Sequence, residues 1–393
     1  MDKRKIKIIV TGTLIYLIST IISYFIFSGQ VLSQTQSPTF STPVVETKKD
    51  QSGRVVFEDK TPKTESCPLN GALYSKKQKD WWESHRPLGV MIENHQESRP
   101  QSGLSYADVV YEAVAEGGIT RFLTVFYCQD AGIIGPVRSA RTYFLDFISE
   151  YGNNPLYAHV GGANTPGPAD ALSQIEKYGW QNHNDLNQFS IDFPTFWRDY
   201  ERMGRTVATE HTMYSATEKL WAKAKERGLT QIDEDQVKWD EEFVPYKFKE
   251  DTSLDKRPEN QIINFEFWSK HKDYIVDWNY DKATNSYLRE NGGEKHLDKN
   301  NNQQLSAKNI IFVFMRESNA NDGYEKNLHL LYGTKGTGKA VVFQDGKEIE
   351  GTWSKKSRTD HLYIYDKAGN EIKLNRGKIW FKIAPTGNDI VVK

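Results

Sequence analysis

The stretch that decides the fold is RPQSGLSYADVVYEAVAEGGITRFLTVFYCQDAGIIGPVRSAR, residues 99–141. Two of its segments, 107–116 and 119–127, have the composition of strands and are separated by Gly117-Gly118. A two-residue hairpin turn favours glycine because its backbone needs positive φ angles. The pattern therefore predicts a β-hairpin within the first folded part of the chain.

Mixed strands and helices are predicted around this hairpin. Apolar residues recur at helical spacing over 140–151, with Ser139 as the N-cap and Gly152 after the end. The same signals predict further elements: strands at 87–93 and 156–160, and helices at 169–178 and 212–227. From residue 262 onward helical periodicity is scarce, and short strands joined by turn pairs indicate compact antiparallel β structure.

The predicted fold class is α+β. An N-terminal mixed α/β domain is followed by a mainly antiparallel β domain, behind a single N-terminal transmembrane helix. Residues 30–66 are rich in Ser, Thr, Pro and Gln and hold few large apolar residues, so we expect a disordered linker there. The predicted segments are a cytoplasmic tail and membrane anchor (1–29), the linker (30–66), the N-terminal α/β domain (67–230), a connector (231–260) and the C-terminal β-rich domain (261–393).

The N-terminus predicts membrane attachment. Ile8–Phe27 carries no charged residue, and twenty residues at about 1.5 Å each span roughly the 30 Å hydrocarbon core. The preceding MDKRKIK holds four basic residues and one acidic residue, so we expect everything after Gly29 to lie outside the cytoplasm. A cleaved signal peptide is the alternative, although no A-x-A-like exit follows Phe27. The expected location is the cell membrane, with a single pass and an extracytoplasmic bulk.

Charge and cysteine content limit the possible partners. The net charge is −1, and about −4 remains once residues 1–7, which contribute +4 and −1, are set aside. So mild a charge gives no support for nucleic acid as a partner. Cys67 and Cys128 either form a disulfide or stay free thiols, because spacing alone cannot fix their geometry. Neither lies in a metal-binding spacing, and we expect no metal and no cofactor.

Several motifs resemble the YerB-like bacterial lipoproteins, a two-part family of unknown function. The matching motifs are RPLGVMIEN (86–94), RPQSGLSYADVVYE (99–112), EGGITRF (116–122), IGPVRSARTYF (134–144), GKAVVFQDGKEIEGTW (338–353) and NRGKIWFKIAP (375–385). The resemblance implies an extracytoplasmic, envelope-associated protein with an N-terminal and a C-terminal domain, and it implies no reaction. Those relatives carry a lipobox cysteine, whereas this chain has a hydrophobic N-terminal segment.

An arginine cluster is the first candidate site. Arg138 precedes the predicted helix cap and Arg141 lies in the first turn, where a positive charge opposes the helix dipole. Arginines in this position suit a bound phosphate or carboxylate, which a guanidinium contacts with two N–H groups. They suit an internal carboxylate equally well, and Arg121 could join either arrangement. The carboxylates available for internal pairing are Glu112, Glu116 and Asp146.

Two other groups are candidates with weaker support. Glu93-Asn94-His95 ends a predicted strand and places a carboxylate beside a histidine, which suits acid–base catalysis or a satisfied polar rim. With His159 it also offers metal ligands, although in no known ligand spacing. Arg289 precedes His296 and Asp298, whose i, i+2 spacing on a strand predicts that one hydrogen-bonds the other. Such a pair could be a catalytic dyad or could stabilise a turn.

No standard catalytic motif is present. The segment GTKGTGKA at 333–340 has Ala340 where a phosphate loop has Ser or Thr, and no helix is predicted after it, so we expect a hairpin loop. No G-x-S-x-G elbow occurs in the sequence. We expect a non-catalytic binding or scaffolding module with an anion site lined by the three arginines. Its expected partners are a cell-wall or membrane-envelope component or an envelope protein, and the membrane itself through residues 8–27.

Two alternative functions remain open. One is an envelope hydrolase or transferase that acts on a phosphorylated or glycan substrate, with Glu93, Glu112 or Glu116 as the acid or base. The other is a structural partner of another membrane protein, which predicts a large apolar patch on the β domain.

Overall fold

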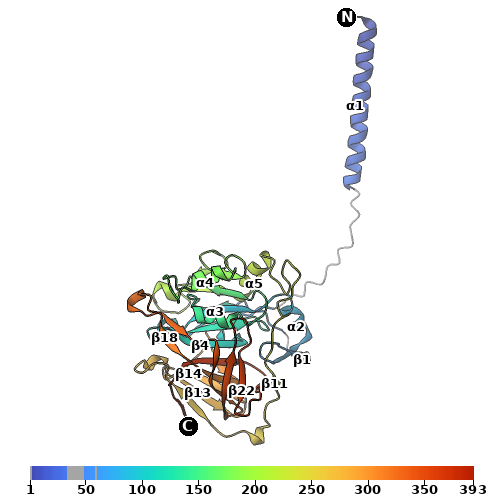
Figure 1. Cartoon of the computed structure of the whole chain (residues 1–393). Helices are drawn as coiled ribbons and strands as arrows, with labels where there is room; N and C mark the ends of the chain where they lie inside the picture. Colours follow the sequence, from blue (N-terminus) through green and yellow to red (C-terminus); the bar gives the residue numbers. More distant parts are fainter. Residues whose placement is uncertain (1, 33–47, 58–59) are drawn as a thin grey trace. The chain divides into compact units, whose positions relative to one another are not determined.

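A computed structural model describes residues 2–32, 48–57 and 60–393, which form two compact units, 1–46 and 47–393. The first unit holds helix α1 (Lys3–Leu32), drawn in blue in Figure 1. Among the described residues, no helix combines the length and the apolar character needed to cross a membrane. The transmembrane span predicted over 8–27 is thus unconfirmed.

The second unit is built on one ten-stranded sheet, the main sheet. In spatial order its strands are β22 (Tyr363–Asp366), β21 (Lys347–Lys355), β20 (Gly336–Gln344), β17 (Asn309–Met315), β24 (Ile379–Pro385), β4 (Val109–Glu116), β5 (Ile119–Phe126), β3 (Leu88–Glu93), β7 (Leu156–His159) and β8 (Asp185–Asn187). Strands β4 and β5 form the predicted hairpin, and Gly117 and Gly118 adopt φ angles of 55° and 81°.

The main sheet joins strands from both predicted domains. Strand β24 pairs in parallel with β17 on one side and with β4 on the other. The C-terminal part was predicted to be mainly antiparallel, and most of its strand pairs are, so these two parallel pairings are exceptions within it. Every residue of β17 and β24 is buried, as expected for parallel strands covered on both faces.

A second sheet covers one face of the main sheet. Its strands are β15 (Glu294–Lys295), β14 (Ser286–Asn291), β13 (Val276–Asp281), β12 (Ile262–Phe265) and β25 (Ile390–Val392), with β16 (Ser306–Ala307) paired to β14. The ring of Trp380 on β24 meets that of Trp278 on β13, with centroids 5.1 Å apart. The neighbouring Phe381 points to the other face of the main sheet, because successive residues of a strand alternate.

Helix α3 (Thr142–Ile148) covers that other face. Phe381 stacks on Tyr111 of β4, and Tyr111 stacks on Phe147 of α3, each pair with centroids 4.8 Å apart. Figure 1 shows α3 on one side of β4 and the strands β13 and β14 on the other. The main sheet is therefore the middle layer of the unit, which gives an α+β fold with few helices.

The remaining helices and small sheets flank these layers. The helices are α2 (Lys76–Trp82), α4 (Ala171–Lys177) and α5 (Thr217–Glu226), with single 3₁₀ turns at Gln96–Ser98, Leu104–Tyr106, Thr209–His211, Leu254–Lys256, Lys272–Tyr274 and Tyr324–Lys326. The small sheets are β1 (Lys63–Ser66) with β2 (Leu73–Ser75), β6 (Ile133–Ile134) with β10 (Met213–Ala216) and β9 (Trp197–Arg198), β11 (Phe248–Lys249) with β23 (Leu374–Asn375), and β18 (Glu317–Asn319) with β19 (Leu330–Tyr332).

Two helix predictions need correction. The helix predicted over 140–151 is shorter, and its N-cap is Arg141 rather than Ser139. The reason is that the preceding chain is extended, with Val137 bridged to Ile92 and Ala140 bridged to Gly162. The helix predicted over 212–227 begins only at Thr217, because β10 pairs with β6 and β9 and keeps the chain extended before it.

Part of the segment predicted as a linker has defined structure. Lys49 is bridged to Val55, and residues 63–66 form β1, so ordered chain begins before Cys67. Residues 30–32, also predicted as linker, belong to the end of α1, and residues 33–47 and 58–59 fall outside the described residues.

Candidate functional site

Two of the three predicted arginines meet on one carboxylate. Glu116, at the end of β4, accepts a hydrogen bond of 2.8 Å from Arg121 on β5 and another from Arg141 at the start of α3. Both arginine side chains are almost fully buried, at 3% and 7% exposure. Burial would raise the pKa of Glu116, but the charges of Arg121 and Arg141 offset this and lower the pKa to about 2. Glu116 is therefore a fixed anion between two cations.

The third arginine pairs with a different carboxylate. Arg138 Nε lies 3.0 Å from Oε1 of Glu93, the last residue of β3, and His211 Nδ1 lies 2.8 Å from the other oxygen of Glu93. The His211 ring stacks on that of His95, with centroids 4.7 Å apart. Burial lowers the pKa of His211, but the hydrogen bond to Glu93 outweighs this and raises the pKa above its usual value.

The arginine cluster therefore contains the internal pairing that the sequence left open as one alternative. Glu116 and Glu93 supply the carboxylates, whereas Asp146 instead accepts hydrogen bonds from Thr334 and Lys335. These two residues belong to the loop between β19 and β20, and residues 336–340 begin β20, so the glycine-rich segment leads into a strand rather than a helix. Strand β19 pairs with β18 and not with β20, so the predicted hairpin loop is wrong. Helix α3, with seven residues, adds little of the dipole on which the predicted anion site relied.

Glu112 is the centre of a second, deeper network. It is fully buried and accepts hydrogen bonds from Arg289 (2.8 Å), Lys382 (2.7 Å) and the Trp380 indole (3.0 Å). Burial lowers the pKa of Arg289 to about 10. Burial would raise the pKa of Glu112, but the two cations outweigh it and lower that pKa. Glu112 thus ties β4 to strands of the second sheet and of the C-terminal part of the chain.

The predicted pairing of His296 with Asp298 is wrong. His296 Nε2 lies 2.6 Å from the Gln101 carbonyl oxygen Oε1, and the carboxylate of Asp298 accepts backbone N–H groups of Gly103 (3.0 Å) and Ser105 (2.7 Å). Strand β15 ends at Lys295, so the two residues lie beyond it and do not share a strand face. Asp298 holds the loop before β4, which is a structural role.

The other predicted polar residues are also satisfied internally. Asn94 donates to Thr120 Oγ1 (2.7 Å) and to Asn291 Oδ1 (3.0 Å). His159 is buried, with Nε2 2.5 Å from Asp185 and Nδ1 2.6 Å from the Gly161 carbonyl. Both ring nitrogens of His159 are thus used in hydrogen bonds to residues other than Glu93.

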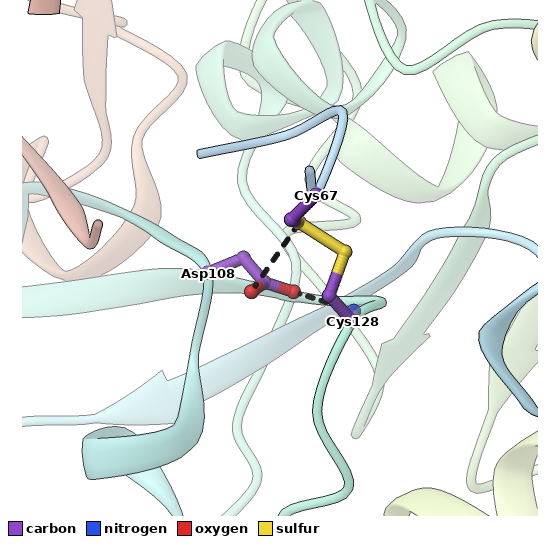
Figure 2. Close-up of side chains that lie close together, drawn as sticks. All are labelled: Cys67, Asp108 and Cys128. Carbon is purple, nitrogen blue, oxygen red and sulfur yellow. Dashed lines mark hydrogen bonds between the residues drawn. A yellow bond between two sulfur atoms is a disulfide. The ribbon is translucent and has the colours of Figure 1, made fainter. Parts of the chain in front are cut away.

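Cys67 and Cys128 form a disulfide, which resolves the question that the sequence left open. Figure 2 shows Asp108 beside it: one carboxylate oxygen lies 3.8 Å from Cys67 Sγ and the other accepts the Cys128 N–H at 2.9 Å. Burial raises the pKa of Asp108 to about 7. The two sulfurs and an Asp108 carboxylate oxygen lie within 4.8 Å of one another, which is close enough to bind a metal ion. The sulfurs are bonded to each other, however, and are therefore not the thiolates that bind metals.

A cleft that we call the Arg99 cleft was not predicted from the sequence, although one of its lining residues, His296, was a candidate site residue. It measures about 600 Å³ and opens beside the loop after β3 and the turn between β14 and β15. Its lining residues are Gln96, Glu97, Arg99, Pro100, Arg205, Asp273, Asn291, Gly292, Glu294, Lys295, His296 and Leu297. Arg99 begins the motif RPQSGLSYADVVYE, but the cleft also needs Arg205 and residues 273–297, which lie more than 100 positions away, so no local signal could have revealed it.

Arg99 is held in this cleft by neutral groups. Its guanidinium donates to Asn94 Oδ1 (3.1 Å), to the Asn94 carbonyl (3.0 Å) and to the Asp273 carbonyl (2.8 Å). It also lies 4.9 Å from the centroid of the Tyr274 ring. Burial lowers the pKa of Arg99 from its usual value, and the group remains a cation near neutrality.

Comparisons with known proteins match this chain in two parts. Models of the DUF3048 family, described as a protein of unknown function, match residues 72–230 with the N-terminal domain and 263–381 with the C-terminal domain. The chain is 30% identical to YerB of Bacillus subtilis (strain 168), a predicted lipoprotein, over 83% of this chain and 88% of YerB. The crystal structure of YerB from Bacillus subtilis matches with a TM-score of 0.67 and 26% identity, over 84% of this chain and 100% of that one.

Proposed function

The chain belongs to the DUF3048 family, and on that premise we propose that it is a non-catalytic binding or scaffolding protein of the cell envelope that holds an anionic envelope component in the Arg99 cleft. Similarity to a predicted lipoprotein fits an extracytoplasmic, membrane-associated protein. The sequence predicted an anion site at Arg121, Arg138 and Arg141. We propose instead that the anion binds in the Arg99 cleft.

The observation that supports the proposal is which arginines form ion pairs with carboxylates inside the protein and which do not. Arg121 and Arg141 share Glu116, and Arg138 pairs with Glu93, so these three charges are offset internally. Arg99, by contrast, forms no ion pair within 4.0 Å among the residues described, and the same holds for Arg205. An unpaired guanidinium can form two parallel hydrogen bonds with a phosphate or carboxylate.

Arg205 is pre-positioned in the same way. One of its terminal nitrogens donates to the carbonyls of Glu97 (2.9 Å) and Arg99 (3.1 Å), and the side chain is exposed. Carbonyl oxygens orient a guanidinium without neutralising it, so the charge stays available to a ligand. The carboxylates of Glu97, Asp273 and Glu294 also line the cleft, which favours a ligand with both a negative group and hydrogen-bond donors.

The proposal is tested by co-sedimentation of the full chain with isolated cell-wall sacculi, before and after wall phosphate polymers are removed. Arg205→Gln should weaken binding about tenfold, the lower end of the effect of a charge-assisted hydrogen bond. Arg316→Gln is the matched control, because Arg316 is exposed and lines no part of the cleft. Equal binding by folded Arg205→Gln and wild type would contradict the proposal.

The enzyme alternative lacks a specific supporting observation. A general acid needs a pKa near the working pH. The pKa values of Glu112 and Glu116 are both lowered, because two cations flank each carboxylate. Two of the three predicted acid or base residues are thus stable carboxylates, which suits structural ion pairs better than proton transfer.

We also propose that the N-terminal segment attaches the protein to the membrane. The support comes from the sequence: an uncharged run of twenty residues, 8–27, follows a basic start. Protease added to intact spheroplasts should then digest the unit 47–393. Full protection of that unit would contradict an extracytoplasmic location.

A further inference from the structure

We infer a second ligand site, independent of the Arg99 cleft, that binds a sugar bearing a negatively charged group. It is a cleft of about 530 Å³, which we call the Arg358 cleft, and this lies within the range of small-molecule sites. It is lined by the turn after α3, by Tyr178 and Trp180 after α4, by residues of the connector, and by the loop between β21 and β22. It shares no lining residue with the Arg99 cleft.

Arg358 supplies an unneutralised cation to this cleft. Its guanidinium carbon lies 4.1 Å from the centroid of the Tyr178 ring and 5.6 Å from that of Trp180. One N–H donates to Ser149 Oγ at 2.6 Å. With any carboxylate in the described part of the chain, Arg358 makes no ion pair within 4.0 Å. Rings and a hydroxyl orient the group but leave its charge for a ligand anion.

The carboxylate deepest in the cleft cannot offset Arg358. Glu150 is 2% exposed at its side chain and lies 3.5 Å from the buried ammonium of Lys355. Its two oxygens accept hydrogen bonds from the Tyr111 hydroxyl (2.6 Å) and from the Leu362 N–H (2.7 Å). Glu150 is therefore fully used inside the protein.

His361 offers a buried polar atom that lacks a partner. The residue is 6% exposed and lines the cleft, and its Nε2 has no hydrogen-bond partner among the described residues. Its ring is fixed between Tyr246 and Tyr363, with centroid distances of 4.3 Å and 4.7 Å. Burial lowers the pKa of His361, so the ring is neutral near pH 7 and Nε2 can exchange a hydrogen bond with a hydroxyl.

The mixture of groups points to a sugar rather than a simple ion. Glu242 and Asp360 line the same cleft, and their carboxylates would repel a small anion but accept hydrogen bonds from hydroxyls. Tyr178, which is partly exposed, presents an amphipathic ring against which the C–H face of a sugar can pack, and the buried Trp180 lies behind it. A ligand with several hydroxyls and one negative group satisfies all of these lining residues at once, with its charge at Arg358.

The test uses the full chain and three probes: N-acetylmuramic acid, glucose 6-phosphate and N-acetylglucosamine. Saturation-transfer NMR detects contact, and calorimetry gives the affinity. We expect at least one of the two charged sugars to bind more tightly than the neutral N-acetylglucosamine. The probes should also compete with one another for binding. The stronger of the two charged probes identifies a carboxylate or a phosphate as the recognised group.

The variants decide whether binding occurs at this cleft. Arg358→Gln should weaken binding of the charged sugar about tenfold or more, because it removes a charge-assisted contact, and should leave N-acetylglucosamine nearly unchanged. Lys356→Gln, at an exposed lining residue, provides the same test with a smaller loss if the Arg358 variant fails to fold. Arg316→Gln and Arg205→Gln should bind like wild type, so failure here is separable from failure of the Arg99 cleft.

Two results would overturn the inference. The first is the absence of saturable binding of either charged sugar in the millimolar range. The second is binding that Arg358→Gln and Lys356→Gln both leave at the wild-type level while melting temperatures show folded protein.

Discussion

Replacing Glu116 by glutamine keeps the size of the side chain and removes only its charge. The substitution leaves Arg121 and Arg141 with no carboxylate between them, at side-chain exposures of 3% and 7%. A buried cation that loses its counter-charge destabilises the folded state. We therefore expect Glu116→Gln to lower the free energy of unfolding rather than to change only a ligand affinity.

Two independent arguments give the size of this loss in the free energy of unfolding. The pKa of Glu116 falls from 4.5 to about 2 in the folded chain, and at about 1.36 kcal/mol per pKa unit this corresponds to about 3 kcal/mol. Removal of one partner from a buried ion pair costs about 3–5 kcal/mol. The Glu116 side chain is 24% exposed, which favours the lower value. The loss is large beside a total stability of about 5–15 kcal/mol.

The assay is urea unfolding of the full chain, followed by circular dichroism over a series of pH values. Because the folded pKa of Glu116 is lowered, its contribution is present above pH 4.5 and disappears as the pH falls through about 2. The stability difference between wild type and Glu116→Gln should therefore be full near neutrality, shrink below pH 4.5 and vanish near pH 2.

Glu176→Gln is the matched control, since Glu176 is exposed and forms no ion pair within the described ranges. It should change stability by less than about 0.5 kcal/mol, as is usual for surface substitutions. A loss below about 1 kcal/mol for Glu116→Gln at neutral pH, or one that does not vary with pH, would refute the role of Glu116 as an internal strut.

Three further outcomes follow from the described contacts. Glu112→Gln should lower the free energy of unfolding by about 3–5 kcal/mol in urea titrations, because it leaves buried Lys382 and a second cation without a counter-charge. His211→Asn should remove a stability term that is full below pH 6.5 and is lost as pH rises through the raised folded pKa, a trend visible in melting temperature against pH. Serine at both Cys67 and Cys128 should cost about 4 kcal/mol under non-reducing conditions, given the 61-residue separation, and an unchanged urea midpoint would contradict this.

Local structure could be predicted because it depends on neighbours in the sequence. The Gly117-Gly118 pair permits the positive φ angles of a tight turn, and the hairpin forms between the strands that flank it. The run NIIFVFM forms β17 over residues 309–315, within the part predicted as short strands, because seven buried residues leave no polar face that favours another element. Family membership was likewise evident from long motifs, and both family models confirm it.

Helix starts were less predictable, because they depend on what the preceding backbone pairs with. Ser139 has the composition of an N-cap, yet bridges on either side keep residues 137–140 extended, and the helix begins after Arg141. In the same way, pairing of β10 with two short strands delays α5 to Thr217. Tertiary hydrogen bonds replaced the local caps at both places.

By itself, then, the sequence determined the hairpin, most of the strands, the family and the residues available for ion pairs. Only the tertiary structure decided which residues become neighbours. Lys382 reaches Glu112 across 270 positions because β24 inserts beside β4, and the two clefts form where loops distant in sequence meet. The physical reason is that each strand buries alternate side chains on the two faces of the sheet, so its neighbours are determined by how the whole sheet packs. No local pattern of residues specifies those neighbours.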